Sequence, residues 1–130
     1  MSVAIVDFGL VVLIWITQLI VYPSFKHFPE EHLLAWHSKY TNRITIIVMP
    51  LMLLQVYFHG LQLYEHFSIY SATSAVLILL IWYNTFLLAI PLHRAISEGR
   101  NVNTSVEKLN RVNWFRTVAW SVTFALSLLH

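Results

Sequence analysis

The chain has 130 residues, of which 58% are hydrophobic and only 11% are charged, whereas charged residues make up about a quarter of an ordinary soluble domain. This composition excludes a soluble globular domain and indicates an integral membrane protein, because lipid accepts apolar side chains on the outside of a helical bundle. The net charge of +2 is too small to indicate nucleic-acid binding, and the absence of cysteine excludes disulfides and thiolate sites.

Four hydrophobic segments are each close to the roughly 20 residues that a helix needs to cross a hydrocarbon core of about 30 Å. They cover approximately residues 3–22, 44–64, 69–92 and 106–129. The sequence therefore predicts an all-α fold, an antiparallel four-helix bundle that spans the membrane as a single domain over residues 1–130.

The link between the first two segments, PSFKHFPEEHLLAWHSKYTNR, is too polar to span a membrane. Pro29 followed by two glutamates is typical of a helix start. Leu33, Leu34, Trp36 and His37 can form one face of a helix that lies along the membrane surface. We therefore expect a short interfacial helix in this link.

Basic residues lie in the first and third links and at the start of the last segment. They are Lys26, Lys39, Arg43, Arg94, Arg100, Lys108 and Arg111. The second link and both termini carry no lysine or arginine. Because cytoplasmic loops are enriched in basic residues, this pattern predicts that both termini lie outside the cytoplasm, and we expect a bacterial inner membrane protein.

Arg116 lies about ten residues into the last segment, which at 1.5 Å per residue is roughly 15 Å deep. A cation at this depth is costly on a lipid-facing surface. Asn113, Thr117 and Trp120 are spaced so that they can share one inward face with Arg116. No acidic residue in another segment is an obvious partner. The candidate acceptors are Gln18, Tyr22, Asn84, backbone carbonyls freed by Pro50 or Pro91, and a bound ligand.

Two interpretations of Arg116 stay open. The polar residues at its depth can hold the helices together by interhelical hydrogen bonds, while the long arginine stem reaches the phosphates. Alternatively, they form a ligand pocket in the cytoplasmic half, which we favour because ionisable residues inside membranes usually serve function. Trp82 and Trp120 can form an apolar wall, so the pocket would suit a flat hydrophobic molecule with a carbonyl, phenol or carboxylate.

His37 and His93 are predicted near the cytoplasmic face. Other polar residues at a similar depth are Tyr40, Arg43 and Asn113. Such a group can act as a general acid or base, ligate a metal or hold haem axially. No two histidines on one segment have the spacing of a metal site, so no metal site is predicted. For His37, function and interfacial packing are equally open, whereas His59 is expected to be a hydrogen-bonded packing residue.

The run FLLAIPLHRAISEGRN followed by VEKLNRVNWFRTVAWSV resembles small bacterial four-helix membrane proteins of a poorly characterised family related to the anthrone oxygenases of polyketide pathways. The shared features are a proline at the end of the third helix, here Pro91, and an Asn-Trp-x-Arg-Thr run, here Asn113, Trp114, Arg116 and Thr117. YPSF and WHSKYTNRI also resemble the first-loop pattern of these proteins. The resemblance implies oxidation of an activated aromatic by O₂ without an obvious cofactor.

The chain departs from the anthrone oxygenases directly after Pro91. Leu92 and His93 follow this proline, whereas those enzymes tend to carry an asparagine beside it.

Two functions are therefore open. One is an oxidoreductase for a lipophilic aromatic or quinone-like substrate, with His37 or His93 moving a proton. The other is a non-catalytic module that binds haem, quinone or lipid, or an accessory subunit of a membrane complex. A third, transport, would require the chain to form a homo-oligomer. The predicted ligand-binding residues are Arg116, Asn113, Asn84, Trp120, Tyr22, Tyr40 and Arg43.

Overall fold

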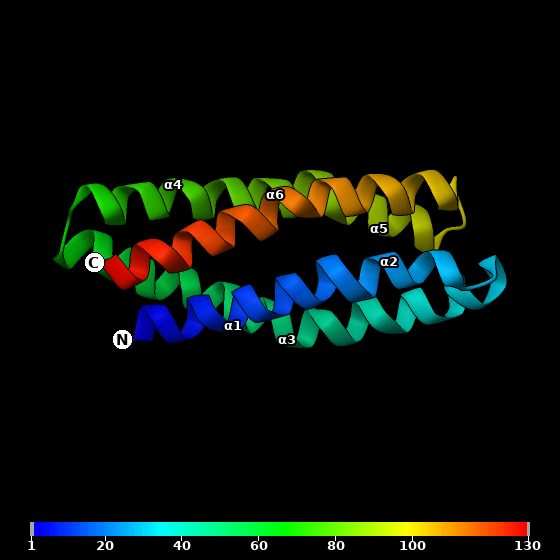
Figure 1. Ribbon diagram of the computed structural model, residues 1–130, viewed down its shortest axis with the longest axis horizontal. Coiled ribbons are helices and arrows are strands. Elements are labelled where there is room, and N and C mark those ends of the chain that lie inside the picture. The colour runs from blue at the N-terminus through cyan, green and yellow to red at the C-terminus, as the bar shows by residue number, and fades with distance from the viewer. Residues whose placement is uncertain (1, 130) are drawn as a thin grey trace.

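The structure is a computed structural model that describes residues 2–129, with side chains described over residues 3–129. Met1 and His130, the end residues of the predicted single domain, lie outside this part of the chain. Within residues 2–129 all regular secondary structure is helical, and the helices form four rods (Figure 1). The predicted all-α fold is therefore confirmed for the described residues.

The first rod changes helix type along its length. It consists of α1 (Ser2–Ile16), the π-helical turn η1 (Thr17–Val21), α2 (Tyr22–Ser24) and the 3-10 turn η2 (Phe25–His27). The π turn ends two residues before Pro23. A proline has no N–H for the helical ladder and clashes with the carbonyl four residues earlier, so it distorts the helix just before it. The rod continues past its predicted end at residue 22.

The third rod repeats this pattern. It consists of α4 (Ile69–Tyr83), the π-helical turn η3 (Asn84–Ala89) and α5 (Ile90–Ser97). The π turn again ends two residues before a proline, Pro91. Because π turns widen a helix and re-aim its side chains, they are frequent at functional sites.

The second rod is one continuous helix, α3 (Glu30–Glu65). It begins directly after Pro29, as predicted, but it continues through the expected link into the second hydrophobic segment. No glycine or proline occurs between Glu30 and Pro50, so nothing in the sequence ends the helix there. A separate short helix is therefore wrong, and an interfacial position for the start of α3 stays a prediction.

Three of the four rods are long and apolar enough to cross a membrane: Val3–His27, Glu30–Glu65 and Ile69–Ser97. This finding indicates a membrane protein. The fourth rod, α6 (Val102–Leu129), is not among them. Asn113, Arg116 and several hydroxyl residues lower the hydropathy of even its most apolar part, so a fourth span over residues 106–129 stays a prediction.

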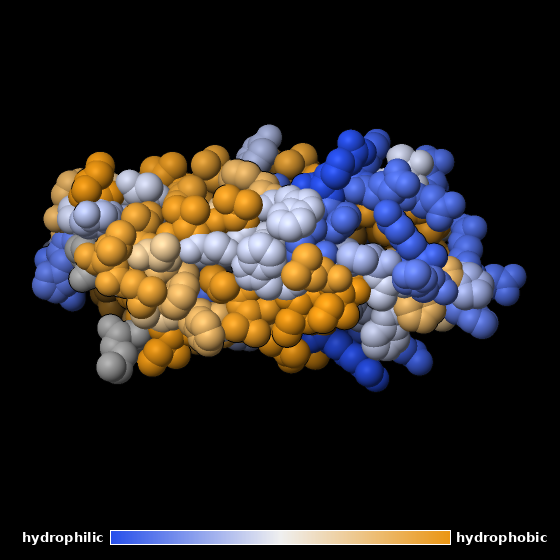
Figure 2. All heavy atoms as spheres, viewed as in Figure 1, coloured by the Kyte–Doolittle hydropathy of each residue, from blue (hydrophilic) through white to orange (hydrophobic). Residues whose placement is uncertain are grey.

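Charge and apolar surface occupy opposite ends of the molecule. Both chain ends lie at one end (Figure 1), and the surface around that end is mainly hydrophobic, whereas the other end is hydrophilic (Figure 2). Large apolar side chains are exposed on all four rods, as lipid-facing residues would be. Examples are Ile20, Ile46, Leu79 and Val118. The side that faces the cytoplasm stays a prediction.

Candidate functional site

Seven buried polar residues form a layer between two apolar clusters of the core. The cluster nearer the hydrophilic end includes Tyr22, Phe25, Leu33, Ile96 and Leu109. The cluster nearer the chain ends includes Val6, Leu10, Met52, Ile81 and Trp120. The residues between them, which we call the polar layer, are Thr17, Gln18, Asn84, Thr85, Asn113, Arg116 and Thr117.

Gln18 is the centre of the polar layer. Its Oε1 accepts hydrogen bonds from Asn113 Nδ2 at 2.9 Å and from Thr117 Oγ1 at 3.0 Å. Its Nε2 donates to Asn110 Oδ1 at 2.7 Å. The π turn η1 carries Gln18, so the distortion before Pro23 places this amide against α6. One side chain thus ties the first rod to the fourth.

Arg116 is held by neutral groups. Its Nη2 donates to Asn113 Oδ1 at 2.7 Å, and its Nη1 donates to Thr85 Oγ1 at 3.3 Å. The Nε atom is buried and has no partner within the described chain. The ion pairs recorded between described residues are His59 with Asp7 and Arg100 with Glu98, and neither involves Arg116. Arg116 as a whole is 7% exposed, and no carboxylate of the described residues forms an ion pair with its positive charge.

Asn84 opens the second π turn and completes the layer from the third rod. Its Nδ2 donates to the Val112 carbonyl at 3.3 Å, while its Oδ1 is buried and has no hydrogen-bond partner among the described residues. Thr85, the next residue in this turn, is the one that accepts from Arg116. Sequence reasoning missed Thr85, although its position six residues before Pro91 could have drawn attention to it.

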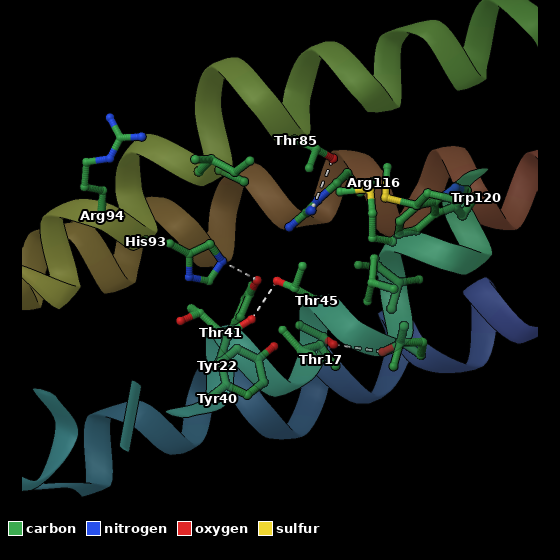
Figure 3. A pocket seen from close by; sticks show the side chains of 18 of the residues that line it. Thr17, Tyr22, Tyr40, Thr41, Thr45, Thr85, His93, Arg94, Arg116 and Trp120 are labelled. Atoms are coloured by element: carbon green, nitrogen blue, oxygen red, sulfur yellow. Dashed lines mark hydrogen bonds between the residues drawn. The ribbon is translucent and has the colours of Figure 1, made fainter. Parts of the chain in front are cut away.

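A cavity of about 430 Å³ lies beside the polar layer (Figure 3). Arg116 and Trp120 line one end, and Tyr22, Tyr40 and His93 line the other. The remaining lining is mainly aliphatic, with four threonines. Those residues include Ile14, Ile44, Val48, Met49, Met52, Ala89, Thr17, Thr41, Thr45 and Thr85. A concave apolar wall with a few polar groups is the usual composition of a small-molecule site.

The cavity opens between α3 and α5. Thr45 on α3 and Arg94 on α5 line it and are exposed. Both helices contribute apolar side chains to the same rim, among them Met49 and Ile90. The opening therefore lies on the side of the molecule and not at the end that carries the termini.

A chain of hydrogen bonds runs from the cavity into the hydrophilic end. Tyr22 Oη lies 3.0 Å from His93 Nε2, and His93 Nδ1 lies 2.9 Å from His37 Nε2. His37 Nδ1 lies 2.9 Å from Ser97 Oγ. His37 is 0% exposed and does not line the cavity, whereas His93 does. The two predicted histidines are therefore brought together, with His93 nearer to any ligand.

The structure brings together most of the predicted site residues, but not all. Arg43 is exposed and does not line the cavity. A ligand-binding role for Arg43 therefore stays a prediction. Arg94 provides the cation at the cavity rim. Of the two deep tryptophans, Trp120 lines the cavity, while Trp82 stacks on Phe86 at 5.2 Å.

The histidine pair does not fit an axial haem ligand set in this arrangement. Two axial nitrogens flank one iron and lie about 4 Å apart, since each metal–nitrogen bond is about 2 Å long. His93 Nδ1 and His37 Nε2 are only 2.9 Å apart and are bonded to each other. Within residues 2–129 no three His, Cys, Asp or Glu side chains cluster as a metal site.

A second polar cluster lies nearer the chain ends, where sequence reasoning saw only packing. Asp7 is 0% exposed and accepts from His59 Nε2 at 2.8 Å, from Gln55 Nε2 at 2.7 Å and from Ser127 Oγ. Gln55 Oε1 accepts from Trp120 Nε1 at 3.0 Å, which links this cluster to the cavity wall. The expectation that His59 is a hydrogen-bonded packing residue agrees with these contacts.

Replacing Gln18 by leucine should lower the free energy of unfolding by about 2 kcal/mol or more, because each buried polar group left without a partner costs about 1 to 3 kcal/mol. Asn113, Thr117 and Asn110 would each lose a bond. Detergent-titrated unfolding of the purified protein measures the change. The matched control is Asn42→Leu at an exposed position, and equal stability of the two variants would contradict a structural role for the layer.

Comparison with known proteins finds no matching family model, no matching curated protein and no matching solved structure.

Proposed function

We propose that this chain is an antiparallel four-helix protein of the inner membrane, with both termini outside the cytoplasm, that binds a lipophilic aromatic or quinone-like molecule in the cavity beside Arg116. We further propose that it oxidises this molecule. The observation that carries the proposal is an unbalanced buried guanidinium at one end of an apolar cavity, with a phenol and two histidines at the other.

The charge of Arg116 supports a ligand with an oxygen atom. A buried cation without a carboxylate partner is costly, and a carbonyl, phenolate or carboxylate placed against it would reduce that cost. Asn113 and Thr85 fix the two terminal nitrogens of the guanidinium. The planar guanidinium group of Arg116 is therefore positioned before a ligand binds. Such fixed donors stabilise negative charge that develops on an oxygen during a reaction.

The remaining lining supports a flat and apolar ligand body. Trp120 contributes an indole ring, and aliphatic side chains of α1, α3 and the third rod supply most of the remaining wall. A volume of about 430 Å³ lies within the usual range for small-molecule sites. The side opening between α3 and α5 would let a lipophilic molecule enter directly from the lipid.

The resemblance to anthrone oxygenases supports the class of reaction. In such a reaction an anthrone and O₂ give an anthraquinone and water, so O₂ is the oxidant. Removal of a proton from the anthrone leaves an oxyanion, which Arg116 would stabilise, while Tyr22 and His93 would receive the proton. No step requires a bound metal or cofactor.

The proposal is tested with anthrone as the probe and the protein in lipid nanodiscs. Tryptophan fluorescence should be quenched on binding, because Trp120 lines the cavity, and O₂ uptake should rise with anthrone concentration. Quenching without O₂ uptake would favour the second candidate, a non-catalytic module that binds quinone or lipid. Absence of both would contradict the proposed site.

A further inference from the structure

The hydrogen-bonded chain behind the cavity consists of groups that can each donate and accept a proton. Tyr22, His93, His37 and Ser97 follow one another at 3.0, 2.9 and 2.9 Å. A neutral imidazole donates from one ring nitrogen and accepts at the other, and a hydroxyl does both. All four members of this chain can therefore relay a proton.

The chain can be hydrogen-bonded completely in either direction. In one arrangement Tyr22 donates to His93, His93 donates to His37, and His37 donates to Ser97. In the other arrangement every donor and acceptor is exchanged, and both histidines change tautomer. No bond is lost in either case, so neither arrangement leaves a buried group unpaired.

The two ends of the chain lie in different surroundings. Tyr22 is 3% exposed and lines the cavity from inside, whereas Ser97 lines the same cavity at an exposed position, three residues after the exposed Arg94. His37 lies between them, fully buried and outside the cavity lining.

Among the described residues, the opposite end of the cavity has no equivalent route. Trp120 Nε1 donates to Gln55 Oε1, and an indole N–H has no lone pair with which to accept a proton. The amide of Gln55 is also not a proton relay. The buried Asp7 and His59 are thereby separated from the cavity.

We propose that Tyr22, His93, His37 and Ser97 form a proton wire that exchanges protons between the cavity and the surface at the hydrophilic end only. Tyr22 takes a proton from the ligand and passes its own to His93. His93 then protonates His37, His37 protonates Ser97, and the serine hydroxyl releases one proton to water. That the proton comes from a bound substrate rests on the proposed function, but the wire itself does not.

The wire is tested without any ligand, by ¹⁵N NMR of histidine-labelled protein in detergent micelles. If protons pass along the chain, both ring nitrogens of His93 should show averaged signals, because its two tautomers interconvert. His37→Gln should convert His93 to a single tautomer, since an amide keeps a hydrogen bond but does not relay a proton. The matched control is His32→Gln, an exposed position on the same helix, which should leave the averaging unchanged.

Ser97→Ala provides a second variant that keeps both histidines in place. It removes the hydroxyl that releases the proton to water, so the averaging of the His93 ring-nitrogen signals should also stop. A single fixed tautomer of His93 in the wild-type protein would overturn the wire, as would averaging that persists in both variants. Because no anthrone is present, these results are separate from the binding and O₂-uptake measurements that test the proposed function.

Discussion

Arg116→Leu should weaken anthrone binding by about 10- to 100-fold, because a hydrogen bond to a charged group contributes about 1.5 to 3 kcal/mol. The variant should still insert into the membrane, since removal of a central charge favours insertion by about 2.5 to 3.5 kcal/mol. Fluorescence titration with anthrone measures the change in affinity.

Three further variants define the role of this arginine. Arg116→Lys should recover little binding, because an ammonium cannot reproduce the planar fork that Asn113 and Thr85 hold. Asn113→Leu should share the defect, since it removes the strongest positioning contact. His66→Leu, at an exposed position, should bind like the wild type. If Arg116→Leu keeps both the affinity and the melting temperature of the wild type, Arg116 neither anchors a ligand nor belongs to a network.

His59→Leu should destabilise the protein by about 3 to 5 kcal/mol, because it leaves the buried carboxylate of Asp7 without its ion-pair partner. His59 Nε2 contacts both carboxylate oxygens, at 3.0 and 2.8 Å. Unfolding by detergent titration measures the loss, with His66→Leu, at the exposed C-cap of α3, as the control.

Replacing both His59 and Asp7 distinguishes the loss of their ion pair from the loss of side-chain packing. In a His59→Leu, Asp7→Leu protein the uncompensated charge is gone, so much of the lost stability should return. A small effect of His59→Leu alone, below about 1 kcal/mol, would show that Gln55 and Ser127 satisfy Asp7 without the histidine.

The inward face of α6 could be predicted because it depends on helical spacing alone. Asn113, Arg116, Thr117 and Trp120 recur at three- and four-residue intervals, and all four are buried. Spacing within one helix is a local property, so the sequence contains it directly.

Contacts between rods could not be predicted in the same way. The depth of a residue along its helix can be counted, but the rotation of that helix depends on the π turns before Pro23 and Pro91. These turns decide that Gln18 and Thr85 face α6. Arg43 shows the same difference, because its depth suits the site although it is exposed and does not line the cavity.

The cluster around Asp7 was missed because its members are far apart in sequence. Asp7, Gln55, His59 and Ser127 come from three rods. In the sequence each of them is an isolated polar residue near the end of a predicted membrane segment, and only tertiary packing brings them together.

Mass spectrometry of the lipophilic molecules extracted from the purified protein tests the central claim most directly. The wild type and His66→Leu should both retain an aromatic or quinone-like molecule that carries an oxygen atom, and Arg116→Leu should retain none of it. The claim would be contradicted if the wild type carried no such molecule, or if Arg116→Leu carried the same molecule in the same amount.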